Sequence, residues 1–127
     1  MAVLPTFIVE DNPLILDTLV STLQELTPVQ VVGAAADESQ AVAWLQQSGH
    51  DCELLIVDIV LKSGSGLGVL RRTAAAAGPQ RRVVLTNYAT PDMRAACRAL
   101  GADRVFDKSS ELDELIAYCE DVARPHA

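Results

Sequence analysis

Residues 53–58 read Glu-Leu-Leu-Ile-Val-Asp (ELLIVD), in which four consecutive apolar residues end at an acid, Asp58. The run has almost no apolar–polar alternation, so it predicts a short strand buried on both faces. Strands of this kind occur in parallel sheets that helices cover on both sides. A carboxylate that ends such a strand needs a partner, because burying an unpaired charge is costly. The stretch therefore indicates an α/β fold and makes Asp58 a candidate functional residue.

Short apolar runs alternate with amphipathic segments on both sides of this stretch. Four further strands are expected, at residues 6–9, 29–33, 82–86 and 104–107. The first helix is expected to bury Leu16, Leu19, Val20 and Leu23, which recur at helical spacing. The other helices are expected around residues 41–45, ending at Gly49; through residues 67–70, stopping before Gly78; from Pro91 to Gly101; and through residues 112–122, with Ser110 and Asp113 as a capping box.

The length and composition fit a single domain built from these five βα units. The chain has 127 residues, of which 50% are hydrophobic and 21% are charged. Alternating βα units build a parallel sheet with helices on both faces, joined by right-handed crossovers. We therefore expect an α/β sandwich of three layers, with a ligand site beyond the carboxyl ends of its strands.

Five polar residues stand where the expected strands end: Glu10, Asp11, Asp58, Thr86 and Lys108. The fold would bring them to one edge of the sheet. Carboxylates that lie close together repel one another, and a hard cation with oxygen ligands relieves the repulsion, so Mg²⁺ is expected here. A carboxylate oxygen of Asp58 can attack an electrophilic phosphorus, while Lys108 and Thr86 hold the phosphoryl oxygens. Together the residues predict phosphoryl transfer to Asp58.

Each member of the set also has an ordinary structural interpretation. Asp11 or Asn12 could be the N-cap of the first helix, because both side chains accept hydrogen bonds from backbone N–H groups. Thr86 could simply end a strand, and Lys108 could balance the charge of Asp107. The combination indicates function more strongly than any of its members.

In their order along the chain, these motifs resemble the receiver domain of bacterial two-component response regulators, of the stand-alone type. The residues that carry the resemblance are Glu10-Asp11 after a strand, Asp58 at the end of LLIVD, Gly66, Thr86 at the end of VVLT, and Lys108 in VFDKSS. The resemblance implies a flavodoxin-like (βα)5 sandwich with a five-stranded parallel sheet. It covers essentially the whole chain, with residues 1–124 as the receiver domain and 125–127 as a short tail.

The resemblance also implies roles for the residues at the strand ends. Asp58 would accept a phosphoryl group from a histidine kinase or a histidine phosphotransfer protein. Asp11 and Asp58 would bind Mg²⁺, together with the carbonyl of Val60, and Glu10 would act through water. Thr86 and Lys108 would contact the phosphoryl group. The protein would not be an enzyme beyond its own phosphorylation and slow dephosphorylation.

The chain departs from the family pattern near its last strand. Val105 stands where receivers usually have a switch aromatic, and Phe106 is expected to point to the opposite face, into the core. Ser109 replaces the usual proline after the lysine, so a trans bond is expected there. Asn87 replaces a small residue and could shield the acyl phosphate from water, whereas Tyr88 could face a partner or be a half-exposed loop residue.

Charge and cysteine content restrict the class of partner and the compartment. The net charge is −7, and basic residues form only dipeptides such as Arg71-Arg72, so binding to nucleic acid or to anionic membranes is not expected. Three cysteines without CxxC spacing, and the absence of a targeting signal, indicate a cytoplasmic protein with reduced thiols.

The expected mode of signalling is protein contact. The 19 residues after Lys108 are expected to hold only the last helix and the tail, so no output domain follows. The expected partner surface carries Arg94, Arg98, Arg104 and the acids of residues 111–114, although these charges could also be a solvated face. The downstream target is expected to be another protein, and the chain itself is expected to be a monomer or a weak dimer.

Rival interpretations explain fewer of these residues. A pseudo-receiver, which binds protein without phosphate, fits Val105 but leaves the acids, Thr86 and Lys108 unexplained. A flavin-binding flavodoxin would need a phosphate-binding loop where Glu10 and Asp11 stand. A phosphatase of the haloacid-dehalogenase type needs a second acid at the position of Val60.

Overall fold

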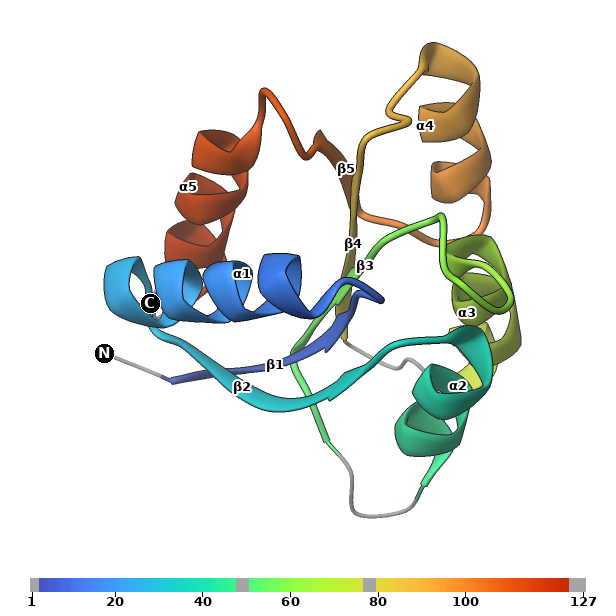
Figure 1. The fold of residues 1–127 in the computed structure, drawn as a ribbon, viewed down its shortest axis with the longest axis horizontal. Coiled ribbons are helices and arrows are strands. Elements are labelled where there is room, and N and C mark those ends of the chain that lie inside the picture. The colour runs from blue at the N-terminus through green and yellow to red at the C-terminus, as the bar shows by residue number, and fades with distance from the viewer. Residues whose placement is uncertain (1–2, 48–50, 77–79, 124–127) are drawn as a thin grey trace.

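The computed structural model describes residues 3–47, 51–76 and 80–123. The five strands are all parallel and lie in the order β2-β1-β3-β4-β5 (Figure 1). This confirms the expected flavodoxin-like α/β fold. In chain order the elements are β1 (Leu4–Val9), α1 (Pro13–Leu26), β2 (Val29–Ala35), α2 (Glu38–Gln46), β3 (Leu54–Val57), α3 (Gly66–Thr73), the 3-10 turn η1 (Ala74–Ala76), β4 (Arg81–Thr86), α4 (Pro91–Ala99), β5 (Arg104–Asp107) and α5 (Leu112–Val122).

The middle strand, β3, is buried on both faces, as the ELLIVD stretch predicts. Leu54 and Ile56 pack in the core under α1 and α5, whereas Leu55 and Val57 pack in the core under α2, α3 and α4. The alternation follows from the pleat, which turns successive side chains to opposite faces. Figure 1 shows α1 and α5 on one side of the sheet and the other three helices on the opposite side.

The start of α1 decides between two interpretations of the acidic turn that precedes it. The Asn12 side chain accepts hydrogen bonds from the backbone N–H groups of Leu14 and Ile15, at 3.0 and 3.2 Å. Pro13 occupies the first turn, where a missing N–H costs nothing. Asn12 is therefore the N-cap of α1, and the Asp11 carboxylate has no part in capping the helix.

The capping box predicted at Ser110 and Asp113 is wrong. The N-cap of α5 is Glu111, and its side chain makes no cap hydrogen bond. The Ser110 N–H instead donates to the Asp107 carboxylate at 3.2 Å. The Asp107 carboxylate therefore organises the turn before α5 through hydrogen bonds to its backbone, and the helix starts after this turn.

Most of the other predicted boundaries agree within a few residues. The strands β1 and β2 are longer than expected, and α3 ends at Thr73, ahead of η1. The predicted stops at Gly49 and Gly78 and the tail at 125–127 lie outside the described residues. Within the ranges that the structure describes, no helix has the length and apolar character needed to span a membrane.

Candidate functional site

Three side chains from separate parts of the chain meet at the carboxyl end of the sheet. Lys108, just after β5, places its Nζ 2.6 Å from Asp58 Oδ2 and in contact with Glu10 Oε1. The side chains of Lys108, Glu10 and Asp58 are only 11%, 3% and 10% exposed. The prediction that strand ends bring an ammonium together with carboxylates therefore holds for these three residues.

Backbone groups fix both carboxylates. Glu10 Oε2 accepts a hydrogen bond from the Asn12 N–H at 3.0 Å, and Asp58 Oδ1 accepts one from the Ile59 N–H at 2.7 Å. The Asp58 N–H donates to the Val9 carbonyl at 3.0 Å, which continues the pairing of β3 with β1. One oxygen of each carboxylate thus accepts a backbone hydrogen bond, and the other oxygen contacts Lys108.

Lys108 is held in its charged form. Burial by itself would lower the pKa of this amine, but the hydrogen bonds to Asp58 and Glu10 outweigh burial and raise the pKa above its ordinary value. A charged ammonium beside Asp58 can stabilise negative charge on a group bound there.

Gly66 allows the loop after Asp58 to close tightly. A Cβ atom at this position would lie 2.1 Å from the Asp58 carbonyl oxygen, and the Gly66 N–H donates to the Ile59 carbonyl at 2.9 Å. Glu38 holds the far side of the loop, because its carboxylate accepts from the Ser65 N–H at 2.9 Å and pairs with Arg72. The loop that carries Asp58 is therefore tied to both α2 and α3.

Thr86 contacts Lys108 through a backbone hydrogen bond and not through its side chain. Its carbonyl accepts a hydrogen bond from the Lys108 N–H at 3.0 Å, and its fully buried hydroxyl accepts one from the Tyr88 N–H at 3.2 Å. Thr86 and Lys108 are thus neighbours across β4 and β5. Tyr88 itself is 56% exposed, which agrees with a loop residue that faces outward.

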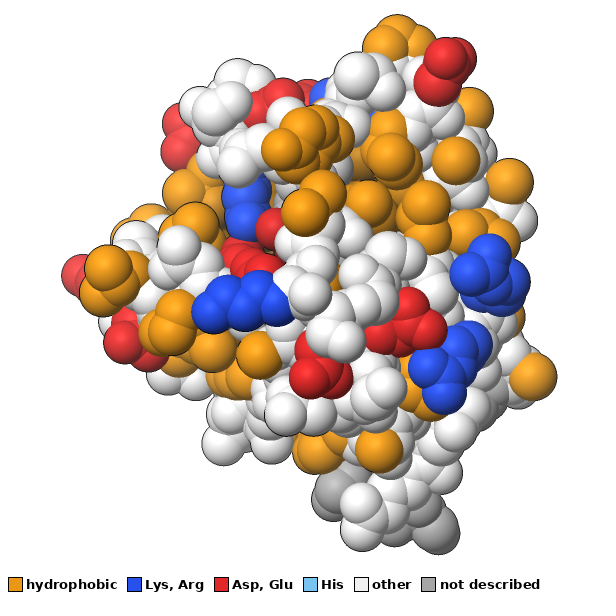
Figure 2. Space-filling view, turned by 45° about the vertical axis from the view of Figure 1, so that its right-hand side comes forward, with side chains coloured by type: hydrophobic (Ala, Val, Ile, Leu, Met, Phe, Trp, Pro, Cys, Tyr) orange, Lys and Arg blue, Asp and Glu red, His pale blue; other side chains and the backbone are white. Residues whose placement is uncertain are grey.

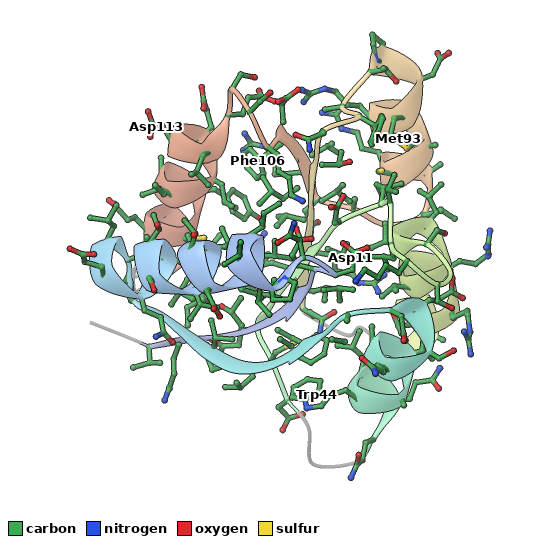
Figure 3. All side chains as sticks on the ribbon, viewed as in Figure 1. Asp11, Trp44, Met93, Phe106 and Asp113 are labelled. Atoms are coloured by element: carbon green, nitrogen blue, oxygen red, sulfur yellow. The ribbon has the colours of Figure 1, made fainter. Side chains whose placement is uncertain are left out.

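Asp11 and Val60 stand at the same end of the sheet without joining the three contacting residues. Figure 3 places Asp11 at the start of α1, and among the described residues no hydrogen bond or ion pair connects it to Lys108. Val60 is 52% exposed and forms an isolated bridge with Ser65. Val60 is exposed and Asp11 is half-buried, and neither belongs to the two hydrophobic core clusters.

These residues fit Mg²⁺ by their chemistry. Carboxylates of Asp11 and Asp58 and the carbonyl of Val60 are hard oxygen donors, and Glu10 adds a third acid. The Lys108 ammonium pairs with both Glu10 and Asp58, so these two acids alone leave negative charge in excess. In the described part of the chain no three acidic, histidine or cysteine side chains are grouped closely enough to hold an ion unaided. A divalent ion would therefore depend on the carbonyl and on water as well.

The strand β5 departs from a receiver switch as predicted. Val105 is buried on the side of α4, and Phe106 is buried on the side of α5, beside Tyr118 (Figure 3). No cis peptide bond occurs in the described residues, so the bond before Ser109 is trans, as expected.

Sequence reasoning missed the role of Arg94, which it placed on a partner surface or a solvated face. The Arg94 side chain is only 28% exposed, and its guanidinium binds Glu111 and two backbone carbonyls. One signal was available in the sequence. Arg94 precedes the buried Cys97 by three residues, a spacing that puts both on one face of α4.

The face that carries the site is polar at its centre and apolar around it. In Figure 2, acidic and basic side chains meet in a hollow bordered by hydrophobic side chains. A cavity of ≈ 260 Å³ adjoins Lys108 and is lined mainly by apolar side chains, among them Leu14, Ile15 and Leu112. Leu14 is 78% exposed, so an apolar surface lies beside Lys108.

Comparison with known families and structures agrees with this geometry. The model of the response regulator receiver domain family matches residues 6–120. No curated protein matches the chain. The signal receiver domain of the putative response regulator NarL from Mycobacterium tuberculosis is similar in fold, with a TM-score of 0.84 at 21% identity over 99% of this chain and 100% of that one.

Two further response regulators are also similar. A DNA-binding response regulator of the LuxR family from Staphylococcus aureus has a TM-score of 0.83 at 16% identity, covering 96% of this chain and 100% of that chain. The RcsB response regulator of Salmonella typhimurium has a TM-score of 0.79 at 20% identity over 100% of this chain. The present chain spans only 64% of that RcsB chain.

Proposed function

The chain belongs to the response regulator receiver domain family, and from that premise we propose that it signals by accepting a phosphoryl group on Asp58. The observation that carries this assignment is the contact of the Lys108 ammonium with the buried carboxylates of Asp58 and Glu10. Receiver domains are signalling modules rather than enzymes acting on other substrates. The donor in this proposal is a histidine kinase or a histidine phosphotransfer protein.

Asp58 would act as the nucleophile. One carboxylate oxygen forms a bond to phosphorus while the P–N bond to the donor histidine breaks, and the electron pair stays on the imidazole nitrogen. Asp58 Oδ2 faces the Lys108 ammonium, so Lys108 can stabilise the charge that develops on the phosphoryl oxygens. Thr86, joined to Lys108 through the backbone, is the second group proposed to contact the phosphoryl oxygens.

Receiver domains bind Mg²⁺ at the acidic site, and the oxygen donors here suit that ion. We assign its ligands to Asp11, Asp58 and the Val60 carbonyl, with Glu10 acting through water. Bound there, Mg²⁺ would supply positive charge that offsets the negative charge of the phosphoryl oxygens.

The proposed output is contact with a protein, by a single receiver domain at residues 1–124 acting as a monomer or weak dimer in the cytoplasm. The exposed apolar residues Leu14 and Ile15 beside Lys108 support docking of a protein donor at the phosphorylation site. Tyr88 and Arg98, both exposed, support a second contact surface around α4. Although DNA-binding regulators share the fold, the net charge of −7 supports an output without nucleic acid or membrane.

Intact-mass measurement after incubation with acetyl phosphate tests the proposal. We expect one phosphoryl group to be added in the presence of Mg²⁺, and none in its absence or in Asp58→Asn. Asp92→Asn, which changes an exposed acid on α4, is the matched control and should still be phosphorylated. A folded protein that gains no phosphoryl group would contradict the proposal and favour a pseudo-receiver that binds protein without phosphate.

A further inference from the structure

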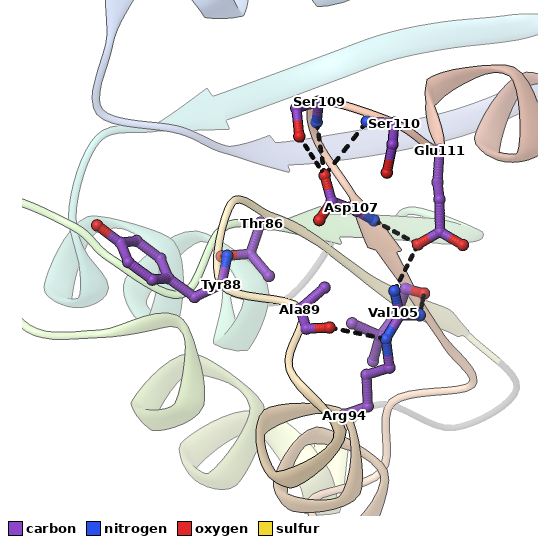
Figure 4. Close-up of polar contacts among 9 residues, drawn as sticks. All are labelled: Thr86, Tyr88, Ala89, Arg94, Val105, Asp107, Ser109, Ser110 and Glu111. Carbon is purple, nitrogen blue, oxygen red and sulfur yellow. Dashed lines mark hydrogen bonds and ion pairs between the residues drawn. The ribbon is translucent and has the colours of Figure 1, made fainter.

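The Arg94 guanidinium joins three separate segments near the phosphorylation site. Its Nε donates to the Ala89 carbonyl at 3.0 Å, Nη1 donates to the Val105 carbonyl at 2.9 Å, and Nη2 lies 2.5 Å from Glu111 Oε1 (Figure 4). We call these contacts the Arg94 bridge. Arginine suits such a junction because its planar group presents several donors in fixed directions.

One end of the Arg94 bridge holds the turn that carries Lys108. Glu111 Oε1 also accepts the Asp107 N–H at 2.9 Å, so the same carboxylate oxygen binds Arg94 and the last residue of β5. Asp107 Oδ1 in turn accepts the N–H groups of Ser109 and Ser110, at 2.8 and 3.2 Å. Residues on both sides of Lys108 are therefore fixed by one continuous network.

The other end of the Arg94 bridge holds the loop that follows Thr86. Ala89 lies three residues after Thr86, and the Tyr88 N–H between them donates to the Thr86 hydroxyl. The Thr90 N–H donates to the Tyr88 carbonyl at 2.8 Å, and the Thr90 side chain caps α4. Arg94 therefore connects the loop after Thr86 with the turn that carries Lys108.

We propose that Arg94 and Glu111 are positioning residues for phosphoryl transfer, which set the relative placement of Thr86 and Lys108 around Asp58. The inference rests on the proposed function, in which Thr86 and Lys108 both contact the phosphoryl group. Val105 takes part through its backbone, because its carbonyl accepts one of the hydrogen bonds from Arg94. Neither positioning residue touches the phosphoryl group, so both act through the segments they hold.

The rate of Asp58 phosphorylation by acetyl phosphate in Mg²⁺ tests this role, measured over a range of donor concentrations. We expect Arg94→Ala to lower the maximal rate about tenfold, because misplacing groups around a reacting centre slows transfer. The donor concentration at half-maximal rate should stay unchanged, since Arg94 does not contact the donor. Arg94→Lys should behave like Arg94→Ala, because one ammonium cannot reach three acceptors.

Glu111 provides an independent pair of variants. Glu111→Gln keeps an oxygen that can accept from Arg94 and Asp107, so its maximal rate should stay within about twofold of the unmodified chain. Glu111→Ala removes the acceptor and should match Arg94→Ala. Arg71→Ala, which changes an exposed arginine on α3, is the matched control and should leave the rate unchanged.

The outcomes separate the two proposals. An unmodified chain that takes no phosphoryl group overturns the proposed function and this inference with it. If the unmodified chain is phosphorylated but folded Arg94→Ala reaches the same maximal rate, only the positioning role is overturned. Equal rates in Glu111→Gln and Glu111→Ala would overturn it too, and that comparison remains available if Arg94→Ala does not fold. A lower melting temperature with an unchanged rate would show a purely structural role.

Discussion

Two ionic clusters lie at the carboxyl end of the sheet, and they differ mainly in burial. The first consists of Lys108, Glu10 and Asp58, whose side chains are nearly enclosed. The second is the pair of Arg94 and Glu111, whose side chains are 28% and 31% exposed. Removing one partner from a buried cluster leaves an uncompensated charge, whereas solvent partly screens the remaining charge of a half-buried pair. The enclosed cluster is therefore expected to dominate stability, and the half-buried pair to act mainly by orienting its neighbours.

The strongest test of this contrast removes the ammonium from the enclosed cluster. Lys108→Met leaves Glu10 and Asp58 side by side without their shared cation, and we expect the free energy of unfolding to fall by about 3 kcal/mol in the absence of Mg²⁺. Urea denaturation measures the loss. Adding Mg²⁺ should restore part of it, because the ion supplies the missing positive charge. An unchanged midpoint without Mg²⁺ would show that the two acids do not depend on Lys108.

A second variant disturbs the enclosed cluster without changing any charge. Gly66→Ala would bring a methyl group against the Asp58 carbonyl, and overpacking of this kind costs about 2 kcal/mol. The loop should shift, so both the urea midpoint and the phosphorylation rate should fall. Ser63→Ala, at an exposed position of the same loop, is the control. Wild-type behaviour of Gly66→Ala would mean that the loop can open without disturbing Asp58.

The contribution of the half-buried pair, Arg94 and Glu111, to stability should depend on pH in the acid range. The hydrogen bond from Arg94 is the main cause that lowers the pKa of Glu111 below its ordinary value of 4.5. A lowered pKa in the folded state stabilises the protein above the ordinary value, and this contribution is lost as pH falls through the folded pKa. Arg94→Ala should therefore shift the urea midpoint at neutral pH by less than the first two variants.

The same shift should shrink at pH values below 4.5, as Glu111 becomes protonated in both proteins. Urea denaturation at a series of pH values, with Arg98→Ala as the reference, measures this trend. A difference that stays constant into strong acid would mean that Arg94 stabilises the fold through its two carbonyl contacts alone.

The smallest effect is expected from a residue outside both clusters. Asn87 is exposed and follows Thr86, where it can shield the acyl phosphate from water. Asn87→Ala should shorten the phosphate lifetime by less than about tenfold, which corresponds to about 1.4 kcal/mol in the barrier. The decay of the phosphorylated mass with time measures it. A lifetime that does not shorten would remove the shielding role of Asn87.

The fold could be predicted from local patterns because each strand can be recognised from a short run of apolar residues. The LLIV run of β3, for example, has no polar face, and only a central strand in a layered fold can bury all four side chains. The strand-end rule then places Glu10, Asp58 and Lys108 together, because it depends on topology and not on side-chain detail.

The remainder of the site depends on choices among competing hydrogen bonds, which local patterns do not resolve. Ser110 has the right spacing for a capping box, yet Asp107 takes its N–H first. Arg94 and Glu111 look like surface charges in the sequence, and they meet only because α4 and the start of α5 flank the same strand. Such pairs need the three-dimensional arrangement before they can be recognised.

The position of Trp44 makes the protein convenient to observe by light. The chain has one tryptophan, and its indole stacks on Phe7 of β1 with ring centroids 4.2 Å apart. Its fluorescence therefore comes from a single place, where α2 packs against β1, the strand that leads to Glu10. Unfolding removes the stacking and should change the Trp44 emission in every variant described above. Unfolding can therefore be followed without a dye label and without introducing a further tryptophan.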